Sequence, residues 1–244
     1  EDNSLNRLMA AEFLERRGVS LTLAGDGGEA VERVKGKTFD AVLMDLHMPI
    51  MDGLEATRLI RELPQGKSLP IIAMTAAVLQ EDRDRCAAVG MVDFIAKPID
   101  PEDMIRVLLK WVKAARQPSR GGTESAAESA GGVLPASLPG FDLEMALYRL
   151  DGNHDLLARL LLGFAGEQSE ALAQLDELLQ ADDSAQAVIL LHTLKGVAAN
   201  LGAEALAEAA RQLEEELKSG NVSASRQDFA EAPNAALDAI KTHI

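Results

Sequence analysis

The sequence Val42-Leu-Met-Asp-Leu-His-Met-Pro-Ile-Met-Asp-Gly53 decides the fold of the first half of the chain. It is an apolar run that ends at an acid, turns at a proline and restarts after Asp52-Gly53. An apolar run bounded by turn residues is typical of a buried strand. Asp45 then lies at the carboxyl end of that strand, where open α/β sheets place their ligand sites. A carboxylate in that position can bind a metal, act as a nucleophile, or do both.

Short apolar runs alternate with amphipathic stretches around this segment. The pattern predicts strands at 20–24, 40–45, 70–75 and 92–96, and helices at 3–17, 28–35, 54–63, 79–89 and 101–115. Such alternation predicts a doubly wound α/β domain over residues 1–116, with a parallel sheet and crossover helices on both faces.

The second half of the chain has a different pattern. Residues 117–138 are rich in Gly, Ser, Ala and Pro without sustained periodicity, and we expect a flexible linker there. Beyond them the sequence shows no strand pattern and predicts helices at 142–150, 154–181, 184–201, 203–219 and 224–242. One short and four longer helices indicate an all-α four-helix bundle over residues 139–244.

Composition narrows the possible partners. The 244 residues are 47% hydrophobic but only 3% aromatic, and the formal net charge of −15 disfavours nucleic acid as a direct partner. Residues 139–244 hold 7 basic and 18 acidic residues, so the second domain carries most of that charge. Cys86 is the single cysteine, which excludes an internal disulfide and fits a reducing compartment such as the cytoplasm. No apolar stretch approaches the roughly 18 residues of a membrane span, so we expect no membrane contact by this fragment.

Chemically active residues follow the predicted strands. Asp45, Thr75 and Lys97 each end a strand, and Glu1-Asp2 precede the first helix. Because the carboxyl ends of parallel strands meet at one rim, we expect these side chains to lie together. Clustered carboxylates suit Mg²⁺, which keeps coordination positions for phosphate oxygens. A carboxylate can attack phosphorus, while an ammonium and a hydroxyl neutralise the other phosphoryl oxygens, so the pocket suits phosphoryl transfer to Asp45.

These motifs resemble the response-regulator receiver domain over residues 1–115. The matching segments are Glu1-Asp-Asn3, Asp45–Gly53, Met74-Thr-Ala76 and Lys97-Pro98.

The receiver resemblance implies a role for each residue of the pocket. Asp45 would accept phosphate and, with Asp2, ligate Mg²⁺ directly. The backbone carbonyl of His47 would be a further ligand, and Glu1 would act through water. Thr75 and Lys97 would contact the phosphoryl group. Phe94 would be the aromatic switch residue that follows the threonine inward on activation.

The resemblance also implies a flavodoxin-like sheet of strand order 2-1-3-4-5. Its central first strand directly precedes the acidic pair, and that strand is missing from this chain, which starts at Glu1. A sheet without it loses ladder hydrogen bonds on two sides. We expect the strand to belong to a longer protein from which this chain is cut; supply by another chain is the alternative.

A second chemical group lies in the predicted helix 184–201. Projection at about 100° per residue separates two stripes. The expected core stripe consists of Ala187, Leu190, Leu194, Val197 and Leu201, and the opposite stripe of Val188, His192, Lys195, Gly196 and Ala199. Lys195 can pair with a phosphoryl group on the imidazole, and Gly196 clears space beside it. Imidazole is both a good nucleophile and a good leaving group at phosphorus.

The segments His192-Thr-Leu-Lys-Gly196, Asn200-Leu-Gly-Ala203 and Leu138-Pro-Gly-Phe-Asp142 resemble the histidine phosphotransfer (Hpt) domain. This resemblance covers roughly residues 138–244. It implies that His192 is phosphorylated and that Lys195 is its charge partner.

Receiver, linker and Hpt domain in this order resemble the carboxyl-terminal end of a bacterial hybrid sensor histidine kinase. The resemblance implies a two-component phosphorelay from an upstream kinase histidine to Asp45, then to His192, then to a downstream response-regulator receiver. It implies a cytoplasmic location, which in a membrane-anchored sensor would be its cytoplasmic end. No ATP-binding glycine boxes occur, so this fragment would relay phosphate without drawing it from ATP. Docking of the two domains within one chain or between chains stays open.

Two other classes of protein are alternatives. A haloacid-dehalogenase-like phosphatase also forms an aspartyl phosphate, but needs a second Asp two residues after the nucleophile, where this chain has His47. The chain could also be a non-catalytic interaction scaffold with an inert receiver.

Overall fold

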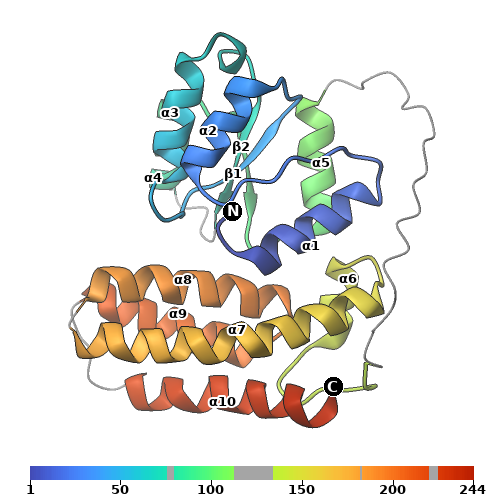
Figure 1. Ribbon diagram of the computed structural model, residues 1–244, viewed down its shortest axis with the longest axis vertical. Coiled ribbons are helices and arrows are strands. Elements are labelled where there is room, and N and C mark those ends of the chain that lie inside the picture. Colours follow the sequence, from blue (N-terminus) through green and yellow to red (C-terminus); the bar gives the residue numbers. More distant parts are fainter. Residues whose placement is uncertain (76–79, 113–133, 182, 220–224) are drawn as a thin grey trace. The chain divides into compact units, whose positions relative to one another are not determined.

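A computed structural model describes residues 1–75, 80–112, 134–181, 183–219 and 225–244 (Figure 1). The chain divides into two compact units, Glu1–Ser125 and Ala126–Ile244. The predicted linker lies mostly outside the described residues. Its last five residues, 134–138, are described, and Leu138 is buried and forms an isolated bridge with Phe141.

The first unit is built on a parallel sheet. Strands β1 (Val42–Asp45), β2 (Ile71–Thr75) and β3 (Asp93–Ala96) pair in the order β1-β2-β3. Asp45 lies opposite Met74, and Thr75 opposite Ala96, so the carboxyl ends of the strands meet at one rim. This confirms the predicted α/β class and brings the ends of the three apolar runs together.

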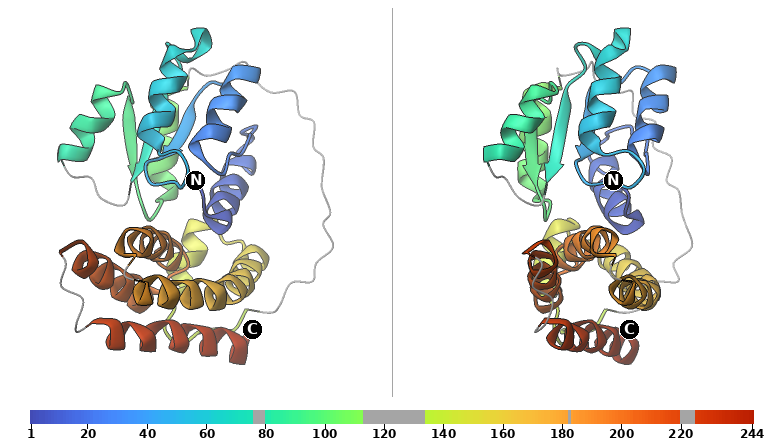
Figure 2. Two further views of the ribbon diagram at one scale, coloured as in Figure 1. Left: turned by 60° about the vertical axis from the view of Figure 1, so that its left-hand side comes forward. Right: turned by 90° about the vertical axis from the view of Figure 1, so that its left-hand side faces the viewer.

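Helices cover both faces of the sheet (Figures 1 and 2). Helices α2 (Gly27–Gly36), α3 (Gly53–Glu62) and α4 (Gln80–Ala88) pack on one face, and a short 3₁₀ turn, η1 (Pro64–Gly66), follows α3. Helices α1 (Ser4–Glu15) and α5 (Pro101–Trp111) pack on the other. Alternate residues of β2 serve the two cores: Ile71 and Ala73 face α2 and α3, whereas Ile72 faces α1 and α5.

The predicted strand at 20–24 is wrong. These residues form no strand pairing, and the sheet has three strands within the described part of the chain. In the order 2-1-3-4-5 the neighbour of this segment would be the strand that precedes the acidic pair, and this chain does not contain it. Without that neighbour the backbone has no ladder to join, and Leu23 is left exposed. The predicted helix 101–115 ends at Trp111, and residues 113–115 lie outside the described part.

The second unit is a helical bundle. A short helix α6 (Leu143–Arg149) precedes α7 (His154–Gln180), α8 (Ser184–Asn200), α9 (Glu204–Ser219) and α10 (Ser225–His243). The four longer helices pack in cyclic order, α7 on α8, α8 on α9, α9 on α10 and α10 on α7, as the right-hand view of Figure 2 shows. This confirms the predicted four-helix bundle. None of the described helices is long and apolar enough to cross a membrane.

The glycine after α8 has a structural function. Gly202 has φ +77°, and a Cβ atom there would lie 2.3 Å from the carbonyl oxygen of Asp142. Its own carbonyl accepts the N–H of Asp142 at 2.8 Å, which joins the end of α8 to the start of α6. Only glycine combines this backbone conformation with so close an approach.

Candidate functional sites

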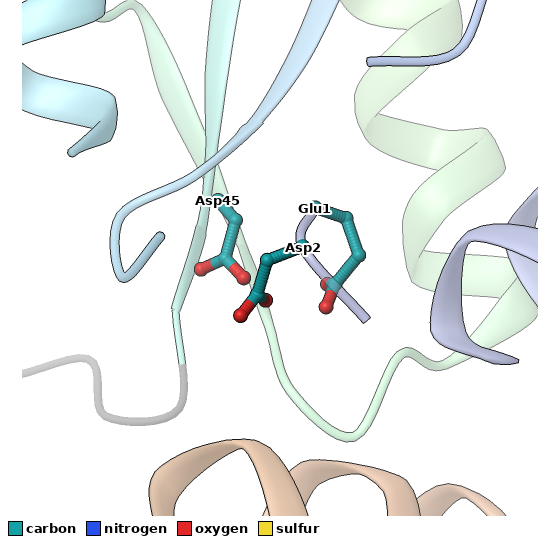
Figure 3. A group of neighbouring side chains, drawn as sticks. All are labelled: Glu1, Asp2 and Asp45. Carbon is teal, nitrogen blue, oxygen red and sulfur yellow. The ribbon is translucent and has the colours of Figure 1, made fainter. Parts of the chain in front are cut away.

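Three carboxylates meet at the rim of the sheet. Asp45 ends β1 and is almost fully buried, and Glu1 and Asp2 come from the segment before α1. The three residues offer oxygen atoms within 4.8 Å of one another. Figure 3 shows their carboxylates side by side beyond the end of β1. The structure therefore brings together the acidic residues that the sequence predicted.

Lys97 supplies the cation of this cluster. Its Nζ donates to Asp45 Oδ2 at 2.5 Å and to Glu1 Oε2 at 2.7 Å, and its side chain is buried. Burial alone would raise the pKa of Asp45, but the charge and hydrogen bond of Lys97 outweigh it and lower that pKa. Burial likewise opposes the charged form of Lys97, yet Asp45 and Glu1 raise its pKa. Both groups of the pair are therefore ionised at neutral pH.

Asp2 is in a different electrostatic position. Burial, followed by the nearby charges of Glu1 and Asp45, raises its pKa. The cluster thus holds more negative charge than Lys97 neutralises. A divalent cation bound by oxygen atoms would relieve this repulsion, so the residues present fit such a cation.

Side chains of helix α1 donate hydrogen bonds to Glu1 and Asp2. Asn6 Nδ2 donates to Glu1 Oε1 at 3.1 Å, and Arg7 Nη1 donates to the carbonyl of Asp2 at 2.7 Å. Neither residue belongs to a motif that the sequence predicted as part of the pocket. The available signal was their place in the first turn of a helix that Asn3 caps by accepting the N–H of Asn6.

The other predicted pocket residues lie around this cluster. Thr75 ends β2 and is buried, and its carbonyl accepts the N–H of Lys97 at 2.7 Å. His47 is exposed, and its backbone N–H donates to Asp45 Oδ1 at 3.1 Å. Phe94 on β3 is half-buried, with the guanidinium carbon of Arg83 4.1 Å from its ring centroid.

In the second unit, His192 lies beside a buried acid. Its Nδ1 is 3.1 Å from Oε1 of Glu214 on α9. Lys195 Nζ donates to Oε2 of the same carboxylate at 2.5 Å, and Lys218 Nζ donates to Oε1 at 2.7 Å. Burial would raise the pKa of Glu214, but these hydrogen bonds outweigh it and hold the pKa well below its ordinary value. An ionised Glu214 only accepts hydrogen bonds, so Nδ1 of His192 carries the proton of the hydrogen bond between them.

The predicted orientation of α8 needs correction. His192 was expected on an open outer face, but only 13% of its side chain is exposed because it turns toward α9. Leu190 was expected in the core and is half-buried, whereas Leu191 is fully buried. A helix that packs on two neighbours buries a wider face than the projection of one helix assumes. Gly196 follows His192 by one turn and is half-buried.

Glu214 is the residue of this cluster that contacts His192, and the sequence motifs gave no indication of it. It comes from the next helix, so no stripe of α8 could reveal it. The signal was an acid at a buried position of an amphipathic helix, between Leu213 and Leu217.

Comparison with known proteins identifies both domains. The model of the response regulator receiver domain matches residues 1–109, and the model of the Hpt domain matches residues 159–243. The chain is a receiver domain followed by an Hpt domain. These are the domains of two-component phosphorelays, and the relatives that match across both domains are sensor histidine kinases.

Two curated relatives align with the receiver–Hpt chain along most of its length. Signal transduction histidine-protein kinase BarA of Escherichia coli is 31% identical over 220 residues, which are 90% of this chain and 24% of BarA. Sensor protein GacS of Pseudomonas syringae is 32% identical over 223 residues, which are 89% of this chain and 24% of GacS. The chain spans about a quarter of the length of these relatives.

Solved structures resemble the receiver part. The receiver domain of the Pseudomonas aeruginosa sensor histidine kinase PA1611, described with a magnesium ion in its active site cleft, is 41% identical, with TM-score 0.44. The match covers 46% of this chain and 92% of that one. A co-crystal structure of the Saccharomyces cerevisiae proteins Ypd1, a histidine phosphotransfer protein, and the Ssk1 receiver matches at 28% identity and TM-score 0.44, covering 46% and 84%.

Proposed function

We propose that this chain carries one phosphoryl group through two stations. An upstream kinase histidine loads Asp45, Asp45 loads His192, and His192 loads the receiver of a downstream response regulator. The observation that supports this best is the buried Asp45, paired with Lys97 at 2.5 Å and flanked by two further carboxylates. We propose residues 1–116 and 139–244 as the functional domains, with 117–138 as linker.

The pocket of the receiver suits Mg²⁺. Asp2 and Asp45 would hold the ion directly, with the backbone carbonyl of His47 and, through water, Glu1. The ion would supply positive charge to the phosphoryl oxygens and to the crowded carboxylates. The raised pKa of Asp2 and the spacing of the three carboxylates support this assignment.

Loading of Asp45 is a direct displacement. A carboxylate oxygen of Asp45 attacks phosphorus, the bond between phosphorus and the donor imidazole breaks, and a neutral imidazole leaves. Lys97 would neutralise a phosphoryl oxygen, and the Thr75 hydroxyl would donate a hydrogen bond to another. Phe94 would follow Thr75 inward as the switch residue.

Transfer to His192 uses the proton that Glu214 holds on Nδ1. The lone pair of Nε2 attacks phosphorus, and Asp45 leaves as a carboxylate. The ring becomes cationic, and the buried Glu214 carboxylate stabilises that charge without moving a proton. Lys195, one turn along α8, would pair with the phosphoryl group, and Gly196 would leave room for its approach.

The setting of this chemistry follows from the same features. The net charge of −15 supports proteins rather than nucleic acid as partners. The proposed upstream kinase uses ATP, and this chain has a single cysteine. Both features support a cytoplasmic site of action. We propose that Asp45 and His192 exchange phosphate by docking of the two domains, within one chain or between two.

Labelling experiments test the proposal. The full chain is incubated with the phosphorylated kinase partner and Mg²⁺, and base-stable, acid-labile label is expected on His192. Asp45→Ala should lose that label, and His192→Gln should keep label on Asp45 alone. His243→Gln, at the exposed end of α10, is the matched control and should behave as the native chain. Label on His192 that persists in Asp45→Ala would refute the order of transfer.

Turnover of simple phosphoesters separates a phosphatase from a relay. A relay should show no sustained hydrolysis, whereas a dehalogenase-like enzyme should show many turnovers. An inert scaffold should take up no label from any donor.

A further inference from the structure

The loop that follows Asp45 contains a residue in an unfavourable conformation. Ile50 has φ +69°, a region that β-branched residues rarely adopt. The N–H of Met51 donates to the carbonyl of Pro49 at 2.7 Å, so Ile50 is the central residue of a γ-turn, a strained turn at positive φ. Glycine or asparagine would adopt this conformation at lower cost.

The rest of the loop is fixed in place. Leu46 and Met48 are buried and Met51 packs on the same core. The carbonyl of Met51 accepts the N–H of Gly27 at 3.2 Å, and the carbonyl of Leu46 accepts that of Gly53 at 3.3 Å. These contacts hold the loop so that the strained turn persists.

Ile50 is turned out of this loop. It is 91% exposed, more than Leu109, the next most exposed large apolar residue of the described chain at 74%. Backbone strain near a reaction site is a ground for a hypothesis of function, and the side chain of Ile50 has most of its surface available to another molecule. Ile50 therefore presents an apolar side chain to the solvent from a strained turn.

The place of Ile50 limits what it can contact. Five residues after Asp45, it lies at most about 18 Å from it along the chain. Asp45 is buried at the base of the rim, so a histidine that exchanges phosphate with it must enter beside this loop. On α8, Ile189 is exposed one turn before His192. A phosphotransfer helix thus offers an apolar side chain next to its histidine.

We propose that Ile50 is a docking contact for the histidine-bearing helix of a phosphotransfer partner, buried against the apolar side chains beside that histidine. The inference rests on the proposed relay and adds a residue that selects protein donors and acceptors over small molecules. Small phosphoryl donors do not need this contact to reach Asp45.

The test uses two variants of the full chain. The donor is Asp45→Ala labelled on His192 with phosphoramidate, whose P–N bond makes it a donor to imidazole. The acceptor is His192→Gln, with Ile50 intact or changed to Gly. Transfer is followed against acceptor concentration. We expect Ile50→Gly to raise the half-saturating concentration roughly tenfold or more, with the rate at saturation changed less than about twofold.

Three controls make the result specific. Labelling of Asp45 by acetyl phosphate should differ by less than about twofold between the Ile50→Gly acceptor and the acceptor with Ile50 intact. The melting temperature of Ile50→Gly should not fall, because glycine accepts φ +69°. Leu109→Ala, on α5, should leave transfer unchanged.

Two outcomes would overturn the proposal. One is a half-saturating concentration in Ile50→Gly equal to that of the acceptor with Ile50 intact. If that variant in addition abolishes self-association, the occupant of the Ile50 surface is a second receiver. The other is an equal loss of acetyl phosphate labelling, which would place Ile50 in the pocket chemistry. Absence of label on Asp45 from either donor with Ile50 intact would instead refute the proposed relay.

Discussion

The two sites use the same pair of groups in different ways. In the receiver, a buried carboxylate lies 2.5 Å from a lysine, Asp45 with Lys97. In the Hpt domain, Glu214 and Lys195 are the same distance apart, and Glu214 is equally buried. Asp45 accepts the phosphoryl group itself in our proposal, whereas Glu214 orients the imidazole that accepts it.

The surrounding charge explains the difference. Two more carboxylates accompany Asp45, and Lys97 forms ion pairs with Asp45 and Glu1. Glu214 is paired with three basic side chains, those of His192, Lys195 and Lys218. In our proposal the receiver site takes up an added cation, whereas lysine side chains supply the positive charge of the Hpt site. A buried carboxylate becomes a nucleophile or a support according to the balance of its neighbours.

The largest expected effect is at the nucleophile. Asp45→Asn keeps the shape of the side chain but removes its nucleophilic oxygen, so labelling by acetyl phosphate should fall about a thousandfold or more. Mass spectrometry of the intact chain measures the phosphorylated fraction. Asp40→Asn, at an exposed position before β1, is the control and should be labelled normally. Label at another residue of Asp45→Asn, at the level of the native chain, would mean that Asp45 is not the residue that accepts phosphate.

Removal of divalent cations should separate the two sites. With EDTA, labelling of Asp45 by acetyl phosphate should drop about a hundredfold, since the carboxylates lose their counter-charge. Labelling of His192 by phosphoramidate should change less than about twofold, because Lys195 and Lys218 already neutralise Glu214. An equal loss at both residues would contradict the contrast between them.

Glu214→Gln tests the supporting carboxylate. Phosphoramidate labelling of His192 should slow about tenfold, since an amide stabilises the cationic ring less well. The variant should also unfold more easily at pH 7, by about 1–2 kcal/mol. The pKa of Glu214 is lowered in the folded state, so its stabilisation is present above the ordinary value of 4.5 and is lost as pH falls below it.

Thermal melts of native and Glu214→Gln chains between pH 3 and 8 measure this difference. The gap in melting temperature should be largest near neutrality and should narrow progressively as the pH falls from about 4.5 toward 3. Glu215→Gln, an exposed neighbour on α9, should show no comparable gap. A gap that stays constant with pH would mean that Glu214 contributes packing rather than charge.

The two lysines of the Hpt site should differ by a smaller factor. Lys195 has 20% of its side chain exposed and Lys218 56%, so solvent screens Lys218 more. Lys195→Met should slow labelling of His192 about tenfold and Lys218→Met no more than about threefold. Stopped time courses with each variant provide the comparison. The reverse ranking would make Lys218 the partner of the phosphoryl group.

The receiver pocket could be predicted from sequence because its residues end consecutive apolar strands. Asp45, Thr75 and Lys97 needed only the rule that parallel strands end at one rim. The strand at 20–24 failed since pairing depends on a neighbour that the local pattern does not report. The φ of Ile50 was also hidden, because an isoleucine gives no signal of positive φ.

The Hpt site was only half predictable. His192 and Lys195 share a helix, so their spacing shows that they are neighbours. Glu214 joins them across a helix–helix contact, and the rotation of α8 that places Leu191 rather than Leu190 in the core depends on both neighbouring helices. Residues brought together by packing need the structure.

One time course tests the central claim most directly. The native chain is mixed with its phosphorylated kinase partner, and base-labile label on Asp45 and base-stable label on His192 are measured from the first seconds. We predict that Asp45 label rises and then falls while His192 label appears after a lag, and that Asp45→Asn shows neither. Label on His192 without a lag, and undiminished in Asp45→Asn, would contradict the account.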